Sequence, residues 1–451
     1  MSFTFSRPLP SGSRLRSRTG TGTGTPGLRR PGGLARVLAA LLTAVGLIAA
    51  APAPQATAAP VKPVVNGPVF NDPFGTPAQQ KAIFTQLVDL VNATPAGQTI
   101  RGSMFEFADQ AVADALLAAH GRGVDVKLIV DDSTYVDANG KEYANAAYTS
   151  LKNGLGTTDT ARSWVVVCDD RFEDADGVDD VQRGCLSVAP PGPAYNHNKF
   201  FLFSSIGPFG DGTTYSKVVF QTSSNLTNWY KVESFNDAVT FTDGPVYDGY
   251  ASYHEKLRAG RYLAGGNNNV YFSTPTGSAY RGYFFPRGDS SYNNPASDTI
   301  VNALDEVACA YTGTDGKRHQ TDIRIVVLYF NDSRIQVANK LADLRAKGCW
   351  IDIVYASAEA KVKTTLTNAS IQHRACMIPN GPGIDVRPHN KQILIDGDYN
   401  GDITPRVYTG SANLNGSSLR SADEAFVRIT SADHHAKYLS AFYKIRSACG
   451  G

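Results

Sequence analysis

Two short segments of the sequence repeat the same chemically active residues. His197 and His389 are each followed two positions later by a lysine, Lys199 and Lys391 respectively. Alternate residues of a β-strand point to the same face, so each histidine can share a pocket with its lysine. An imidazole can attack phosphorus or carry a proton, and an ammonium group can neutralise a phosphodiester oxygen. The repeat therefore predicts a phosphoryl-transfer site that uses one histidine from each copy.

Each histidine–lysine pair is followed by a serine and an asparagine with the spacing S-x-N. Ser223 and Asn225 come after the first pair, and Ser411 and Asn413 come after the second. Their hydroxyl and amide groups are neutral hydrogen-bond donors suited to phosphate oxygens. The alternative is a duplicated binding domain with exposed edge-strand histidines. We consider it weaker, because binding does not require all four residue types to recur.

Two further pairs of residues follow these motifs. Asp237 and Glu424 occupy equivalent places in "SFNDAVTF" and "SADEAFVRI". A carboxylate there can hold the far nitrogen of an imidazole and fix its tautomer. Trp229 and Tyr230 follow the first S-x-N motif closely. An aromatic pair beside a phosphate site can bind a quaternary ammonium head group, or it can belong to the core, and both interpretations stay open.

The elements that carry these motifs occur twice and in the same order. In the first part, a strand near 99–109 precedes a helix at 110–123 and a buried strand at 124–132; in the second, a strand at 321–332 precedes a helix at 335–348 and a strand at 349–356. The inward helix positions that we expect are Val112, Leu116 and Ala119 in the first helix and Ile335, Ala338, Leu341 and Ala342 in the second.

Strands that alternate with helices indicate an α/β fold. We predict two homologous α/β/α sandwich halves with mixed sheets, related by a pseudo-twofold axis, with the active site between them. The expected divisions are residues 1–58, 59–262 and 263–451, with the join near the glycine- and asparagine-rich segment 261–272.

The first 58 residues have the pattern of a secretory signal peptide. Seven arginines and no acidic residue precede or flank an apolar run at 37–51, and Ala56–Ala58 provides a small-residue cleavage site. We predict a secreted protein cleaved near Ala58 without a transmembrane anchor, and leave general and twin-arginine export open. Removing the seven arginines leaves 36 basic and 41 acidic residues, a net charge of −5. That charge disfavours nucleic acid as a partner, because counterion release rewards basic proteins.

The six cysteines are expected to form disulfides, because an exported protein meets an oxidising environment. Cys168 and Cys185 bracket one acidic loop and are predicted to pair. Cys309, Cys349, Cys376 and Cys449 allow three pairings, among which the sequence does not choose. Neither the acidic loop at 168–185 nor the segment 396–402 fits a calcium-binding loop fully, so no metal is assigned.

The motifs resemble those of the phospholipase D superfamily. The second copy carries the full H-x-K-x4-D and G-S-x-N patterns: His389, Lys391, Asp396, Gly410, Ser411 and Asn413. With both copies on one chain behind a signal peptide, the sequence is similar to the secreted bacterial phospholipase D enzymes. The resemblance implies hydrolysis of phospholipids at a membrane or micelle surface through a phosphohistidine, with no cofactor, and transfer of the phosphatidyl group to alcohols. It also implies that His197 is the nucleophile and His389 the leaving-group acid. We expect a monomer.

The first copy departs from the pattern at two positions. Ser204 replaces the motif aspartate, and Thr222 replaces the motif glycine. The motif aspartate comes five residues after the lysine, so on a regular strand it faces away from the pocket and is expected to have a structural role. Two alternatives to a lipid phosphodiesterase remain: a secreted endonuclease of the same superfamily, and an inactive lipid-binding relative.

Overall fold

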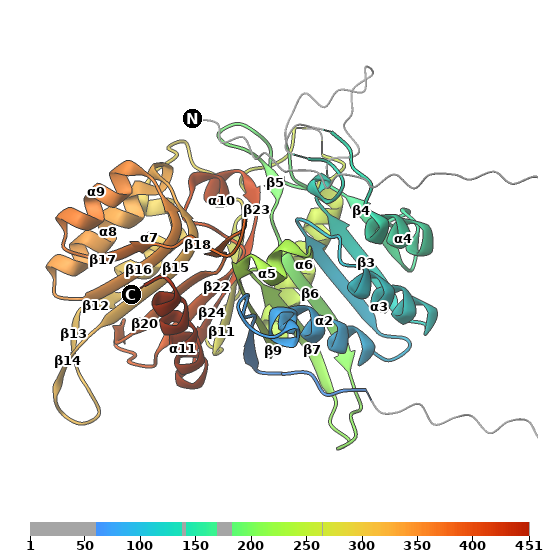
Figure 1. The fold of residues 1–451 in the computed structure, drawn as a ribbon, viewed down its shortest axis with the longest axis horizontal. Coiled ribbons are helices and arrows are strands. Elements are labelled where there is room, and N and C mark those ends of the chain that lie inside the picture. The colour runs from blue at the N-terminus through green and yellow to red at the C-terminus, as the bar shows by residue number, and fades with distance from the viewer. Residues whose placement is uncertain (1–59, 138–140, 169–182, 264, 451) are drawn as a thin grey trace, which may run out of the picture. The chain divides into compact units, whose positions relative to one another are not determined.

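Each half of the chain builds a mixed β-sheet (Figure 1). The computed structural model describes residues 60–137, 141–168, 183–263 and 265–450. The predicted signal peptide lies outside the described residues, as does most of the acidic loop at 168–185. Within the described residues, no helix is long and apolar enough to cross a membrane. The predicted boundary at 262/263 stays a prediction.

The first sheet has seven strands, and apolar runs such as "FFLF" in its centre and "WVVV" at one edge are buried on both faces. Three strands are parallel neighbours and the others are antiparallel. In spatial order they are β1 (Gly67–Phe70), β9 (Asp237–Thr242), β7 (Tyr215–Thr222), β6 (Lys199–Ile206), β2 (Thr99–Met104), β3 (Asp125–Val130) and β4 (Trp164–Val167).

The second sheet has eight strands in a corresponding order. They are β10 (Phe272–Ser273), β11 (Tyr280–Phe284), β24 (Ala425–Thr430), β22 (Arg406–Gly410), β20 (Lys391–Asp396), β15 (Asp322–Phe330), β16 (Trp350–Ala358) and β17 (Gln372–Ala375). β15, β16 and β17 are parallel, as β2, β3 and β4 are in the first sheet. β6 and β20, which follow the two histidines, occupy matching central places. The predicted α/β repeat with mixed sheets is confirmed.

Helices cover both sheets. The outer helices of the first half are α2 (Ala82–Asn92), α3 (Gln110–Gly121) and α4 (Ala146–Leu155), and those of the second are α7 (Thr299–Asp305), α8 (Ile335–Ala346) and α9 (Ala360–Asn368). The buried face of α3 is as predicted. In α8, Ile335 and Ala342 are only half-buried, while Val337 and Leu344 complete the buried face. The helix is therefore rotated slightly from the predicted orientation.

Two further helices lie between the sheets (Figure 1). α6 (Gly244–Gly260) and α11 (Ala432–Ala448) contribute aromatic residues to a hydrophobic core that contains strands of both halves. Leu202 of β6 and Leu394 of β20 belong to this one core, with Tyr250 of α6 and Phe442 of α11. The two halves therefore share buried apolar surface, which stabilises their association.

Short strands join the halves reciprocally. β5 (Tyr195–Asn196) pairs in parallel with β23 (Ala422–Asp423), and β19 (Asp385–Pro388) pairs in parallel with β8 (Ser234–Phe235). In each case the strand directly before a motif histidine binds a segment of the opposite half. The remaining elements are α1 (Pro77–Gln80), α5 (Trp229–Val232), α10 (Gly416–Arg420), β12 (Val307–Ala308), β13 (Ala310–Thr312), β14 (Arg318–Gln320), β18 (Ile378–Pro379) and β21 (Asp398–Tyr399), with 3-10 turns at Asp132–Thr134, Pro295–Ser297 and Asp332–Arg334.

Three disulfides link the six cysteines. Cys168–Cys185 is present as predicted. Of the three possible arrangements for the other four, the structure has Cys309–Cys349 and Cys376–Cys449. The last bridge ties the end of α11 to the edge beyond β17.

We predict that peptide mapping under non-reducing conditions will recover these three bridges. The Cys309–Cys349 bridge spans 40 residues, so replacing both cysteines with alanine should lower the free energy of unfolding by about 4 kcal/mol through lost restraint of the unfolded chain. Urea unfolding of the oxidised proteins measures this loss. A free thiol in the native protein, or unchanged stability of the double variant, would contradict the assignment.

Candidate active site

The two motif histidines are held by the half of the molecule opposite their own. The His197 backbone N–H donates to the carbonyl of Asp423 at 2.9 Å, and that of His389 donates to the carbonyl of Phe235 at 2.8 Å. Both bonds continue the reciprocal strand pairs described above. The imidazoles are therefore brought to the interface between the halves. They lie near enough for His197 to influence the pKa of His389.

Each motif lysine folds back toward its own histidine. Lys199 Nζ donates to the carbonyl of His197 at 2.8 Å, and Lys391 Nζ donates to that of His389 at 2.6 Å. Both lysines are buried. Burial lowers the pKa of Lys199 to about 7, and burial together with the Lys199 charge holds the pKa of Lys391 well below its usual value. An anion bound between the two ammonium groups would favour their charged forms.

The side-chain amides of the motif asparagines contain buried atoms that form no hydrogen bond with the described residues. Both amide atoms of Asn225 and the amide oxygen of Asn413 are buried without a hydrogen-bond partner among the described residues. Buried polar groups without partners are uncommon and point to a missing ligand or water. With the two lysines, the amide nitrogen of Asn225 can donate to a non-bridging oxygen of a phosphodiester, whereas the amide oxygen of Asn413 is an acceptor and fits a donor such as water or an alcohol.

The motif serines have a different environment from the predicted one. Ser223 Oγ accepts the N–H of Asp237 at 3.0 Å, and Ser411 Oγ accepts that of Ala425 at 3.1 Å. Each hydroxyl also lies within hydrogen-bond distance of the carbonyl of the same residue. The two serines therefore join the ends of adjacent strands, and this positions the loops that carry the asparagines.

The His197 ring is oriented by a carboxylate of the opposite half. Nδ1 of His197 lies 3.0 Å from Oε1 of Glu424, so this carboxylate holds an imidazole as predicted. Burial alone would raise the pKa of Glu424, but the His197 ring and the Lys199 ammonium hold it below the ordinary value. The ionised carboxylate accepts the Nδ1 proton, which leaves Nε2 with a free lone pair. Burial lowers the pKa of His197 to about 4, so the imidazole is neutral at pH 7.

The His389 ring is oriented by an amide, and the prediction that Asp237 holds an imidazole is wrong. Nδ1 of His389 lies 3.0 Å from Oδ1 of Asn236. The amide orientation is fixed, because Nδ2 of Asn236 donates to the hydroxyl of Ser234 at 2.8 Å and to the carbonyl of Tyr230 at 3.1 Å. His389 must therefore donate from Nδ1. Burial, followed by the charges of the two lysines, lowers its pKa well below the usual value.

The error has a simple cause in strand register. Aligning "SFNDA" with "SADEA" pairs Asp237 with Glu424. In the structure Phe235 and Asp423 accept the equivalent histidine N–H bonds, so the next residues, Asn236 and Glu424, are the true counterparts. Successive residues of an extended chain point to opposite sides. A shift of one position therefore replaces a carboxylate with an amide.

Asp237 has another buried role at the interface. Oδ1 accepts the amide of Asn390 at 2.9 Å, and Oδ2 accepts the hydroxyls of Thr409 and Tyr438 at 2.5 and 3.0 Å. All three donors belong to the second half of the chain. The carboxylate thus joins β9 to β22, to α11 and to Asn390, which lies between His389 and Lys391.

The motif aspartate lies at the far end of its strand, away from the site. Asp396 ends β20 and pairs in register with Asp322 at the start of β15. Its counterpart Ser204 accepts the backbone N–H of Thr99 and donates to Gln98, both at 2.8 Å. Both residues therefore lie beside the first residues of the neighbouring strands, Asp396 beside β15 and Ser204 beside β2, at the ends of these strands away from the pocket. This position explains how serine can replace aspartate without altering the pocket.

Gly410 of the second motif has no room for a side chain, whereas the equivalent Thr222 of the first motif fits its surroundings. A Cβ at Gly410 would lie 2.5 Å from the carbonyl oxygen of Ala425. In the first half Thr222 fits, and its hydroxyl donates to the carbonyl of Asp237 at 2.7 Å while accepting the N–H of Ser224 at 3.0 Å. Thr222 therefore supports the loop before Asn225 instead of disrupting it.

Aromatic rings surround both histidines. Phe105 and Tyr195 contact the His197 ring with centroid distances of 5.0 and 5.5 Å. Tyr230 and Trp229 contact the His389 ring at 4.9 and 6.3 Å. The structure thus brings the predicted aromatic pair to the site. Phe105 and Tyr195 were missed by sequence reasoning, although Tyr195 lies only two residues before His197.

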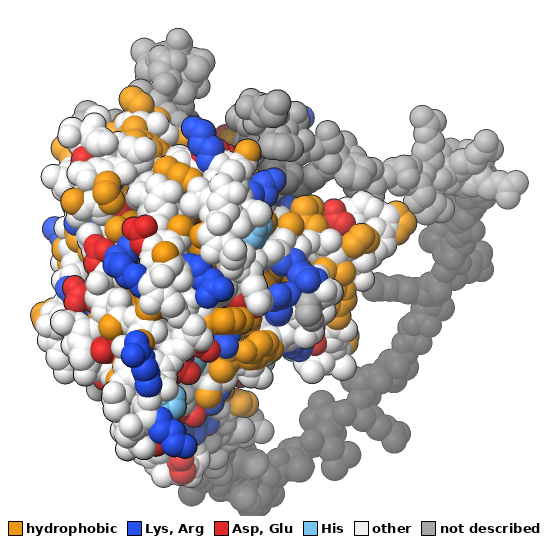
Figure 2. Space-filling view, turned by 90° about the vertical axis from the view of Figure 1, so that its left-hand side faces the viewer, with side chains coloured by type: hydrophobic (Ala, Val, Ile, Leu, Met, Phe, Trp, Pro, Cys, Tyr) orange, Lys and Arg blue, Asp and Glu red, His pale blue; other side chains and the backbone are white. Residues whose placement is uncertain are grey.

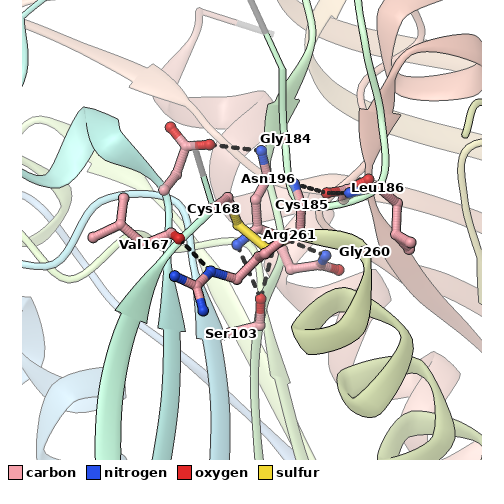
Figure 3. Close-up of a disulfide and its surroundings, with 12 residues drawn as sticks. Ser103, Val167, Cys168, Gly184, Cys185, Leu186, Asn196, Gly260 and Arg261 are labelled. Atoms are coloured by element: carbon pink, nitrogen blue, oxygen red, sulfur yellow. Dashed lines mark hydrogen bonds between the residues drawn. A yellow bond between two sulfur atoms is a disulfide. The ribbon is translucent and has the colours of Figure 1, made fainter. Parts of the chain in front are cut away.

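The Cys168–Cys185 disulfide lies close to the strand that enters the site (Figure 3). Its neighbour Asp423 accepts the backbone N–H groups of Cys185, Leu186 and Ser187 at 2.7–3.0 Å. Asp423 and the two cysteines form the one potential metal-ligand group found among the described residues. The disulfide removes the thiolates that would bind a metal, so we interpret the group as a structural anchor for Asp423 and the adjacent Glu424.

Comparisons with known proteins agree with this arrangement. Residues 90–258 and 317–446 match the family described as "Cardiolipin synthase, PLD-like domain". The chain belongs to this family. The two matched segments contain the first and second motif copies respectively, so the phospholipase D superfamily resemblance is confirmed. No curated protein sequence matches the chain significantly.

Solved structures resemble this chain at low identity, and the first of those below has a TM-score that supports a shared fold. Phosphatidylserine synthase from Haemophilus influenzae has 14% identity and a TM-score of 0.51, covering 86% of this chain and 87% of its own. Polyphosphate kinase from Porphyromonas gingivalis has 13% identity and a TM-score of 0.45; 87% of this chain is covered but only 55% of the kinase. The phospholipase D family member Nuc from Salmonella typhimurium has 19% identity and a TM-score of 0.26, covering 34% of this chain and 91% of its own.

The different partners of the two histidines predict opposite responses to isosteric substitution. Asn236→Asp places a carboxylate at Nδ1 of His389 and should raise the pKa of that imidazole, because a negative neighbour favours the imidazolium. Glu424→Gln should lower the pKa of His197 for the converse reason. Titration of both rings by nuclear magnetic resonance measures the shifts, with the unchanged histidine of each variant as its control. Shifts in the same direction for both variants would contradict the assigned contacts.

Proposed function

We propose that this protein is a secreted phosphodiesterase of phospholipase D type, which cleaves phospholipid head groups through a phosphohistidine. The observation that best supports this proposal is the arrangement of two neutral, differently oriented imidazoles around buried lysines and the unpartnered amide nitrogen of Asn225. Family membership supports action on a phosphodiester. The similar solved structures include a synthase, a kinase and a phospholipase D family member. Because these proteins differ in activity, the lipid substrate is our inference.

In the proposed reaction, Nε2 of His197 attacks phosphorus while the bond from phosphorus to the head-group oxygen breaks. Binding of the phosphodiester anion beside His389 would favour its imidazolium form, in which Nε2 as well as Nδ1 carries a proton, and this imidazolium gives the Nε2 proton to the leaving oxygen. Neutral His389 then takes a proton from water, and the water oxygen attacks phosphorus and releases His197. An alcohol in place of water would give phosphatidyl transfer. Lys199, Lys391, Asn225 and Asn413 would bind the non-bridging oxygens throughout.

The unequal partners of the histidines support this division of labour. A phosphorylated imidazole that keeps its Nδ1 proton is positively charged, and the Glu424 carboxylate beside His197 would stabilise that charge. His389 has a neutral amide partner, so its protonated form gains less stabilisation and is a stronger acid. The carboxylate thus belongs beside the nucleophile and the amide beside the proton donor.

Charge supports a lipid over a nucleic acid substrate. The chain after the predicted signal peptide has a net charge of −5. On the face of the second half, Lys and Arg side chains are interspersed with acidic and hydrophobic ones and form no continuous basic surface (Figure 2). Nucleic-acid binding surfaces are characteristically basic. The three disulfides fit export, and we propose a secreted monomer, released near Ala58, that acts at lipid surfaces.

We predict that the purified protein will release head groups from phospholipid vesicles in EDTA and leave plasmid DNA intact. The site supplies nucleophile, acid and positive charge from side chains, so chelation should not reduce activity. Head-group release and gel electrophoresis provide the two measurements. Cleavage of the plasmid alone would favour the nuclease alternative, and inactivity on both would favour the inactive relative.

Substrates with different leaving groups test the histidine roles. His389→Ala should nearly abolish cleavage of an alkyl ester, whose alkoxide needs a proton, but should retain much more activity on a p-nitrophenyl ester, whose phenolate leaves unaided. His197→Ala should abolish both activities, because no covalent intermediate can form. Rescue of the His197 variant by the good leaving group would reverse the roles.

A further inference from the structure

A pocket of about 590 Å³ opens beside the proposed catalytic groups. Three tyrosines, Tyr195, Tyr292 and Tyr329, line it. Tyr195 contacts the His197 ring, as described above. Tyr329 influences the pKa of Tyr230, whose ring lies 4.9 Å from that of His389. The pocket therefore lies beside the His197 ring.

The polar lining of the pocket is electrically neutral. Asn331 and Asn415 offer amides, and Ser333 and Ser417 offer hydroxyls. Among the residues described as lining it, none is Lys, Arg, His, Asp or Glu. Neutral amides and hydroxyls beside aromatic rings suit an alcohol with several hydroxyl groups, which donates and accepts hydrogen bonds and presents C–H faces to rings. An acyl chain would offer no hydrogen bond to the Asn331 amide or to the amide nitrogen of Asn415.

The pocket wall is built to a fixed shape. A Cβ at Gly416 would lie 1.7 Å from the Tyr292 ring, and one at Gly192 would lie 2.9 Å from the Tyr292 hydroxyl. The ring therefore rests where two glycines leave space. Arg420, which is buried, donates to the carbonyl of Tyr292 at 3.1 Å and to that of Arg287 at 2.8 Å. A wall held in this way can select a ligand without first ordering itself.

The alternative aromatic surface suits a cationic head group less well. The Arg387 guanidinium already lies over the Trp229 ring, 5.1 Å from its centroid. A quaternary ammonium bound to that ring would meet a like charge. Nor does the tyrosine-lined pocket offer a carboxylate among its described lining residues to neutralise choline or ethanolamine.

We propose that this pocket binds a neutral polyol head group, so that the preferred substrates are phospholipids esterified to glycerol or inositol. The inference depends on the proposed function, because it assigns the head group of the same reaction. Polyol hydroxyls would bond to Asn331, Asn415 and Ser417, with the ring of Tyr292 against the carbon skeleton.

The test compares kcat/KM for phosphatidylglycerol, phosphatidylinositol, phosphatidylcholine and phosphatidylserine, with identical acyl chains, at low mole fraction in uncharged detergent micelles. Phosphatidylserine controls for anionic lipid charge, because its head group is charged. The two polyol lipids should exceed the other two by at least tenfold. Equal or greater activity on phosphatidylcholine or phosphatidylserine would overturn the proposal.

Two variants connect the preference to the pocket. Asn331→Asp is isosteric, and its side chain caps no helix; the added charge should reduce the glycerol-to-choline ratio of kcat/KM at least tenfold. Tyr292→Ala should lower activity on the polyol lipids tenfold and change phosphatidylcholine activity much less. Tyr311→Phe, which removes a hydroxyl on the β13–β14 hairpin outside the pocket, should leave the ratio unchanged. An unaltered ratio in both pocket variants would overturn the assignment.

Cleavage of bis(p-nitrophenyl) phosphate tests the phosphodiesterase function separately from the head-group assignment. If it is cleaved by the wild type but the lipids show no polyol preference, the head-group assignment fails while the phosphodiesterase stands. If neither it nor any lipid is cleaved, the proposed function fails and the head-group assignment fails with it. Preferential cleavage of oligonucleotides would replace the polyol with a nucleotide in the pocket and would also overturn the proposal.

Discussion

The burial of two lysine ammonium groups between the sheets is the constraint on which the structure depends. Lys199 and Lys391 are removed from water at the centre of the molecule, and isolated buried charges are strongly disfavoured. Glu424 of the second half, together with Glu106, Asp131 and Asp237 of the first, acts to raise the pKa values of these lysines. Because the compensating carboxylates come from both halves, the environment of the two lysines forms only when both are assembled, and the shared core and reciprocal strand pairs maintain that assembly.

An approximate twofold repeat has here produced an unsymmetrical site. The backbone contacts of His197 and His389 match closely, yet one imidazole faces the carboxylate of Glu424 and the other the amide of Asn236. The carboxylate stabilises positive charge on its ring, whereas the amide only fixes a tautomer. Two histidines with equivalent backbone positions therefore have different acid–base properties. Asp237 is not the partner of His389 and instead joins the two halves through its hydrogen bonds.

The same asymmetry extends to the surroundings of the site. The His389 side has the Trp229 ring with Arg387 over it, and the His197 side opens to a neutral pocket walled by Tyr195 and Tyr292. Equivalent segments of the two halves have thus diverged outside the motifs while the motif backbone stayed alike. Differences in substrate preference among relatives of this fold can arise in these segments, because they surround the proposed phosphate site without forming it.

The sequence by itself determined the repeated strand–helix order, the two histidine–lysine pairs and the S-x-N clusters, because local periodicity and motif spacing are properties of the chain. It also indicated the Cys168–Cys185 bridge, since that loop is short. Only the tertiary structure decided the other two disulfides, the partner of His389 and the neutral pocket. These depend on contacts between distant segments, where a one-residue change in register exchanges Asp237 for Asn236. No local pattern reports that register, because the two halves set it jointly when they pack.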